Sequence, residues 1–185
     1  MYDKMIIVPQ IFNSLSMIVP FFSWWRHRKT HSHNGLHKIL RVHIPLSALY
    51  HLTAAFGFPI SNLLRAIDIF FVHMQGIASG REIINLAKCR HHKQIAYVVL
   101  GASTIIHYIT YRKNMTDDLS MSRYLLIMFN NSSLYSIRRD VFWKLMMYGA
   151  ISYKLYFLDN KICVGHALFH CMLFFIYNAY FGLFV

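Results

Sequence analysis

The stretch ICVGHALFHCMLFFIYNAYFGLF, residues 162–184, contains no Asp, Glu, Lys or Arg. A helix needs roughly 20 predominantly apolar residues to cross the hydrocarbon core of a bilayer, so this stretch is long and apolar enough to form a transmembrane helix. Its two histidines, His166 and His170, stand four residues apart and would share one face of that helix. The stretch therefore predicts a membrane span that carries two imidazole groups.

Apolar runs of similar length recur along the rest of the chain, separated by basic or polar breaks. We expect further spans at residues 5–25, 39–58, 62–79, 94–111, 121–136 and 141–158. The run at 121–136 is the weakest because the polar residues Asn130 to Ser133 follow its apolar core, and an interfacial segment is the alternative there. We predict an all-α, polytopic (multi-pass) membrane protein, in which residues 1–185 form a single domain of seven transmembrane helices with short loops.

The composition agrees with this fold class. The chain is 56% hydrophobic and only 14% charged, whereas about 25% of the residues of a soluble domain are charged. A soluble protein of 185 residues could not hide this much apolar surface from water. A disordered segment needs low hydrophobicity and high charge, which is the opposite composition. Both classes are therefore disfavoured.

The net charge of +12 is interpreted as a sign of topology. Lys and Arg gather in the cytosolic loops of polytopic proteins, and most of the 19 Lys and Arg residues follow the first, third and fifth expected spans. These loops are therefore placed in the cytosol, with the N-terminus lumenal or extracellular and the C-terminus cytosolic. Basic residues dispersed in this way favour membrane lipids over nucleic acid as partners.

Five polar side chains are expected at one depth of the membrane. Ser47 and His51 lie four residues apart in the second span, Asp68 lies in the third, and His166 and His170 lie in the seventh. Polar groups at membrane depth are costly, so they are candidates for a functional site. Histidines at positions i and i+4 of a helix recur in zinc sites. The common depth favours a single site over separate structural roles.

Each of these residues also has a structural alternative. Asp68 can pair with Arg65, three residues earlier on the same helix face. Ser47 can bond to a carbonyl of its own helix, and intramembrane histidines can hold helices together. The remaining histidines receive no role. Contact with lipid headgroups or solvation is expected for those in the basic loops, which are His27, His31, His33, His37, His91 and His92. No role is assigned to those in or near spans, which are His43, His73 and His107.

The order of these motifs resembles the CREST superfamily of seven-helix membrane proteins. This group includes alkaline ceramidases, the progestin and adipoQ receptors, GPI-lipid remodelling proteins and myomaker-like proteins. The resemblance rests on Ser47-x-x-x-His51 in the second helix, an Asp at the start of the third, and His166-x-x-x-His170 in the last. It implies that His51, His166 and His170 hold a zinc ion, with Ser47 and Asp68 beside it.

Zinc on three imidazoles keeps one coordination position open, as in catalytic sites. Asp68 would then act as a general base, and Ser47 would donate a hydrogen bond to the developing oxyanion. The expected reaction is hydrolysis of a ceramide-like lipid amide or of an ester, with the fatty acyl chain of the substrate lying between apolar helices.

Two other functions stay open. The first is a non-catalytic CREST-type protein, with a membrane-remodelling or receptor role and a structural zinc site. The second is a di-iron lipid hydroxylase or desaturase, a class that also uses histidine boxes in membranes. His33-x-x-x-His37 fits one such box, but near His91-His92 a full HxxHH motif is absent.

Overall fold

The computed structural model describes residues 4–114, 129, 131–162 and 164–184 of the chain. Within these ranges the chain forms helices and no strand. In chain order the elements are α1 (Lys4–Ser16), α2 (Ile18–His27), α3 (Gly35–Ala55), α4 (Ser61–Leu86), α5 (Arg90–Asn114), η1 (Asn131–Ser133), α7 (Leu134–Ile137), α8 (Arg139–Ile162), α9 (Gly165–Phe181) and η2 (Gly182–Phe184). The prediction of an all-α fold is confirmed.

Most of the predicted spans coincide with long helices. The run at 5–25 covers α1 and α2, and the runs at 39–58, 62–79, 94–111, 141–158 and 162–184 correspond to α3, α4, α5, α8 and α9. The run at 121–136 falls largely outside the described residues, and its described end forms η1 and the short helix α7.

Helix composition does not decide the number of membrane spans. By length and composition, one helical stretch among the described residues is apolar enough to cross a membrane: Ile7–His27, which combines α1 and α2. A signal sequence or the core helix of a soluble protein would pass the same test. Of the other long helices, α9 has only 17 residues, and α3 and α4 carry buried histidines and hydroxyl groups, which lower their hydropathy. The seven-span topology therefore stays a prediction.

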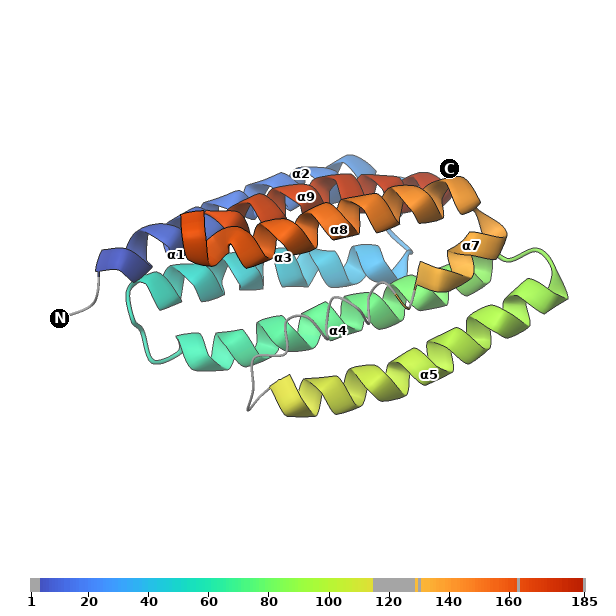
Figure 1. Ribbon diagram of the computed structural model, residues 1–185, viewed down its shortest axis with the longest axis horizontal. Helices are drawn as coiled ribbons and strands as arrows, with labels where there is room; N and C mark the ends of the chain where they lie inside the picture. The colour runs from blue at the N-terminus through green and yellow to red at the C-terminus, as the bar shows by residue number, and fades with distance from the viewer. Residues whose placement is uncertain (1–3, 115–128, 130, 163, 185) are drawn as a thin grey trace.

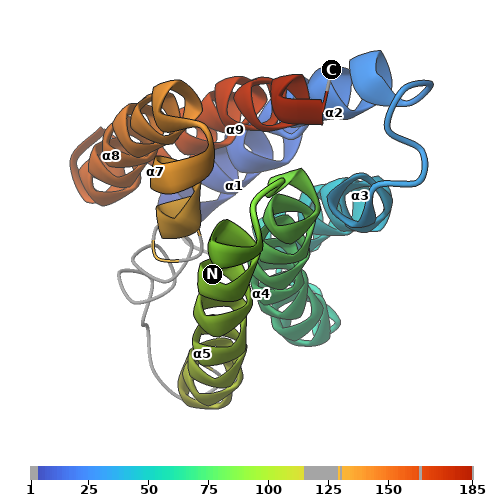
Figure 2. The same ribbon diagram turned by 90° about the vertical axis from the view of Figure 1, so that its right-hand side faces the viewer.

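The long helices lie side by side along the longest axis of the molecule (Figure 1). α9 packs against α8, α2 and α1, α3 packs against α1 and α4, and α5 packs on α4 at one edge of the bundle (Figure 2). The start of α1, the α3–α4 turn and the start of α9 lie at one end, which we name the N-terminal end (Figure 1). The C-terminus, the α2–α3 loop and the α4–α5 loop lie at the opposite, C-terminal end.

Local sequence explains how these helices begin and end. α1 and α2 are separated because Pro20 has no N–H to donate to the carbonyl of Ser16, four residues earlier. Asn34 caps α3 by accepting a hydrogen bond from the backbone N–H of His37 (3.2 Å). After α3, Gly57 has a φ of 67°, a left-handed conformation that favours glycine. This turn reverses the chain, so that α4 runs antiparallel to α3.

The interior of the bundle is apolar towards one end and polar elsewhere. The apolar core lies towards the C-terminal end and includes Leu40, Ile83, Leu134 and Phe181, whose exposed fractions are all 0%. The interior also holds many buried polar side chains, among them Asn13, Ser23, His43, Ser47, His51, His73, Ser103, His107, Ser152 and His170. The polar part of the interior contains the candidate site.

Candidate metal centre

Three histidines converge towards the N-terminal end of the bundle. His51 lies near the end of α3, and His166 and His170 lie in the first two turns of α9. One ring nitrogen from each lies within 4.8 Å of the others, and the ring centroids are 4.7, 5.0 and 5.3 Å apart. The structure thus brings together the three residues predicted as ligands, and this cluster could hold a metal ion. Imidazole suits several transition metals, so the cluster alone does not identify the ion.

Helix α1 orients two of these rings from outside the cluster. The Nδ1 atom of His51 lies 2.7 Å from Oε1 of Gln10. The Nδ1 atom of His170 lies 3.1 Å from the carbonyl oxygen of Asn13 and 2.8 Å from Oγ of Ser16. Carbonyl oxygens only accept hydrogen bonds, so both Nδ1 atoms carry the proton and both Nε2 atoms keep a lone pair. Metal-binding histidines are typically oriented in this way by the groups behind them.

The predicted neighbours Ser47 and Asp68 lie beside the cluster and line the same cavity as the three histidines. Asp68 does not form the ion pair with Arg65 that the sequence offered as an alternative. Among the described residues it pairs instead with His43 of α3, whose Nε2 lies 2.9 Å from Oδ1 of Asp68. Ser47 interacts with the same carboxylate. Asp68 therefore pairs between helices α3 and α4, and the alternative of a pair within α4 is not formed.

A hydrogen-bonded chain continues from His43 away from the cluster. Nδ1 of His43 contacts Nε2 of Gln75, from α4. Oε1 of Gln75 accepts a hydrogen bond of 2.9 Å from the hydroxyl group of Tyr177, from α9. The ring of Phe71 stacks on the His43 ring at 5.8 Å, with an interplanar angle of 17°. His43, to which the sequence gave no role, is therefore held on both nitrogens and on one face.

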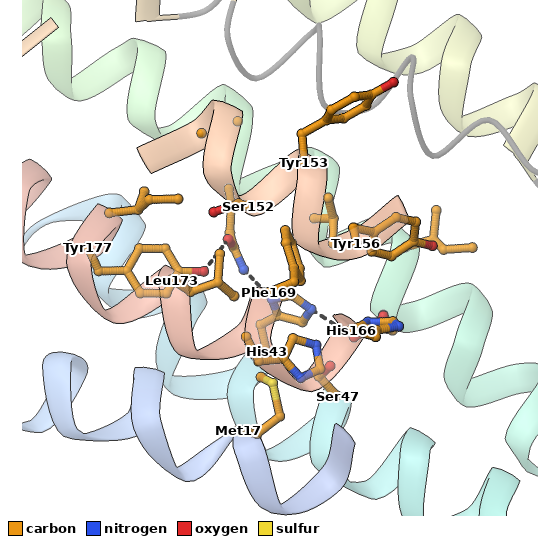
Figure 3. A pocket seen from close by; sticks show the side chains of 18 of the residues that line it. Met17, His43, Ser47, Ser152, Tyr153, Tyr156, His166, Phe169, Leu173 and Tyr177 are labelled. Carbon is orange, nitrogen blue, oxygen red and sulfur yellow. Dashed lines mark hydrogen bonds and ion pairs between the residues drawn. The ribbon is translucent and has the colours of Figure 1, made fainter. Parts of the chain in front are cut away.

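A cavity of about 350 Å³ connects these groups. It extends from the three histidines to Leu36 and Tyr180, towards the C-terminal end. Figure 3 shows Ser47, His43 and His166 around it, with Leu173 and Tyr177 farther along α9. Leu36 and His51 are 15 residues apart in α3, which corresponds to about 22 Å at 1.5 Å per residue. The cavity is therefore elongated, with a polar end at the histidine cluster and apolar side chains along its walls.

Among the remaining histidines, two depart from the prediction and two that received no role form a pair. His31 and His37, expected in solvated loops, are only 4% exposed and pack around Phe181 at centroid distances of 5.1 and 5.8 Å. His73 and His107 form a buried pair between α4 and α5, with 2.8 Å between their Nδ1 atoms. Elsewhere in the described part of the chain, no second group of three potential ligands converges. The box residues of the di-iron alternative are not brought together there.

Sequence reasoning missed the contribution of α1. Gln10, Asn13 and Ser16 are spaced three residues apart, which places them along one face of a helix. The interval between His43, Ser47 and His51 is four residues, so these three also share one face of α3. Both spacings are visible in the sequence, and they are the signals that could have identified these residues.

Comparisons of the chain with known protein families, with curated proteins and with solved structures found no match in any of the three. The resemblance to the CREST superfamily therefore stays a prediction that rests on the quoted motifs.

Proposed function

We propose that this protein is a membrane-embedded, zinc-dependent hydrolase of the CREST type that cleaves the amide, or the ester, of a lipid with a fatty acyl chain. The observation that carries the proposal is the convergence of His51, His166 and His170 beside Asp68 and Ser47 at one end of an elongated cavity. The five residues come from three helices, so their meeting is a property of the fold.

The distribution of polar and apolar side chains supports a membrane location. Large apolar residues are exposed along the outer faces, for example Leu15 (64%), Ile18 (59%), Phe22 (55%) and Trp143 (54%), while histidines and hydroxyl groups are buried. Soluble monomers rarely expose such extensive apolar surface. Figure 1 shows the two chain ends at opposite ends of the bundle. This arrangement agrees with an odd number of spans, which would place the two chain ends on opposite sides of the membrane.

The residues present fit a zinc ion. Imidazole is a common zinc ligand, and the proton on Nδ1 of His51 and His170 leaves Nε2 available for a metal. A zinc ion held there would supply a Lewis acid that polarises a carbonyl group and makes water more acidic. The remaining requirements of hydrolysis fall to the protein's own side chains.

Asp68 and Ser47 provide these functions in the proposed mechanism. The Asp68 carboxylate can take the proton that water loses when it attacks the carbonyl carbon, and it can return that proton to the leaving nitrogen. The Ser47 hydroxyl can turn away from the Asp68 carboxylate and donate its one hydrogen bond to the carbonyl oxygen as negative charge develops on that oxygen. The cavity walls, which include Ile69, Val72 and Leu173, can hold the acyl chain in an apolar environment.

Metal content and turnover test the proposal separately. Detergent-purified wild-type protein should contain stoichiometric zinc by elemental analysis, and His166→Ala should lose it. His91→Ala is the matched control, because His91 is exposed and lies outside the cavity. Wild type should release fatty acid from ceramides or N-acyl lipids, and Asp68→Ala should not.

The same measurements distinguish the alternatives. Retained zinc with no turnover by either wild type or Asp68→Ala would favour a membrane-remodelling or receptor role with structural zinc. Bound iron in place of zinc would favour the lipid hydroxylase class. Wild-type protein without any bound metal would refute the metal centre itself.

A further inference from the structure

We propose that His43 is a positioning residue: its Nε2–H group holds Asp68 in place, and Gln75 and Tyr177 fix the position of its own proton. The catalytic part of this inference rests on the proposed hydrolase function, whereas the hydrogen-bonded arrangement does not. His43, Gln75 and Tyr177 are not among the three candidate ligands.

The direction of each hydrogen bond follows from the chemistry of the groups. The Asp68 carboxylate can only accept, so Nε2 of His43, 2.9 Å from Oδ1 of Asp68, must carry a proton. In a neutral imidazole the other nitrogen, Nδ1, is then an acceptor. Gln75 presents its amide NH₂ to that nitrogen, and its oxygen accepts from the Tyr177 hydroxyl group. Every donor in the chain thus faces an acceptor, and the chain ends on Asp68.

The hydrogen-bonded chain from Tyr177 through Gln75 and His43 to Asp68, which we name the relay, is built from the same three helices as the candidate site. α3 contributes His51 to the centre and His43 to the relay, two turns earlier on the same face. α9 contributes His166 and His170 to the centre and Tyr177 to the relay. α4 contributes the carboxylate and Gln75, seven residues later. A shift of any one helix would therefore disturb the relay together with the centre.

The hydrogen bond from His43 holds the Asp68 carboxylate in place. Oδ1 is engaged by His43 at 2.9 Å, which fixes the orientation of the carboxylate relative to α3. The His43 side chain is 7% exposed and that of Asp68 is 17% exposed, so few water molecules can compete for Oδ1. Phe71, stacked on the ring, restricts its rotation. Hydrogen-bonded support behind a reacting group commonly determines whether that group is held in productive geometry.

The tautomer of His43 can be measured without any activity. ¹⁵N-histidine NMR on the purified full-length chain should show His43, assigned by its absence in His43→Gln, with a protonated Nε2 and an unprotonated Nδ1. In Gln75→Glu the neighbouring carboxylate only accepts, so Nδ1 should become protonated. A wild-type His43 protonated on Nδ1 alone or on both nitrogens would overturn the proposal. So would a spectrum that is unchanged in Gln75→Glu.

Turnover tests the catalytic part. His43→Leu should lower kcat by roughly 100-fold, within the range that general acid–base groups contribute, with bound zinc and KM nearly unchanged. His43→Gln keeps an N–H donor and should recover part of that loss, while the control His91→Ala should match wild type. Equal losses in the Leu and Gln variants, or a loss of zinc in both, would reduce His43 to a structural role. If wild type hydrolyses no lipid, the proposed function fails, whereas the NMR result still decides the relay.

Discussion

Gln10 should control the metal affinity of the site although it is not a candidate ligand. Its side chain accepts the Nδ1 proton of His51 at 2.7 Å. Gln10→Leu would remove this acceptor, so that the ring loses both its orientation and part of its basicity. Loss of such a group typically costs 10–100-fold in metal affinity, which corresponds to about 1.4–2.7 kcal/mol of binding free energy.

The structure provides a graded series around this variant. Gln10→Glu keeps an acceptor at the same position and should bind metal nearly as tightly as wild type. Ser16→Ala should have a small effect, because Nδ1 of His170 still donates to the carbonyl group of Asn13 at 3.1 Å. Ser14→Ala is the matched control: Ser14 lies on the same helix, but its hydroxyl group donates to the carbonyl of Ala48 at 2.9 Å.

A competition titration of zinc between the purified protein and a chelator of known affinity measures these differences directly. Circular dichroism at the same concentrations verifies that each variant is folded. The reasoning is refuted if Gln10→Leu binds zinc as tightly as Ser14→Ala, or if Gln10→Glu loses as much affinity as Gln10→Leu. Either result would mean that α1 contacts the rings without orienting them.

Three further predictions concern other parts of the molecule. Asp68→Asn should keep stoichiometric zinc by elemental analysis while lipid hydrolysis falls by roughly 10²–10⁴-fold, the range for a lost general base. Gly57→Ala should lower the free energy of unfolding by about 1 kcal/mol in a denaturant titration, because alanine at a positive φ is strained; Gly101→Ala, with open space around it, is the control. Burial, with a further contribution from the neighbouring His27, lowers the pKa of His31, so the folded chain binds fewer protons there than the unfolded chain. Stability should therefore fall as the pH drops below about 6.5, and the pH dependence of the thermal unfolding midpoint should be weaker in His31→Gln.

The sequence predicted most of the long helices and the three candidate ligands, and the reason is geometric. Periodic apolar runs predict where the long helices lie in the chain. Because consecutive predicted spans run in opposite directions, the position of a residue within its helix predicts the end of the bundle towards which it lies. His51, near the end of α3, and His166, near the start of α9, therefore had to lie towards the same end. Whether the rings face one another depends on helix rotation, which the structure supplies.

The partners of these residues were harder to predict because they depend on contacts between helices. For Asp68, sequence spacing offered Arg65 on the same helix, whereas the carboxylate turns towards His43 of α3. The sequence assigned no role to Gln10, which lies in the first apolar run. Its role depends on α1 packing against α3. His31 was expected to be solvated because it lies in a basic loop, but that loop folds over Phe181.

The protons already present on the histidine cluster disfavour the addition of further protons to its rings. His51 and His170 already donate their Nδ1 protons to α1, so each ring could gain a proton only at Nε2. Protonation of both would place two positive charges with ring centroids 5.3 Å apart, in an interior where both side chains are at most 3% exposed. Like charges at such a distance strongly disfavour each other away from water. A divalent ion held there would instead take the lone pairs of the rings, and the Asp68 carboxylate, which lines the same cavity, would offset part of its charge.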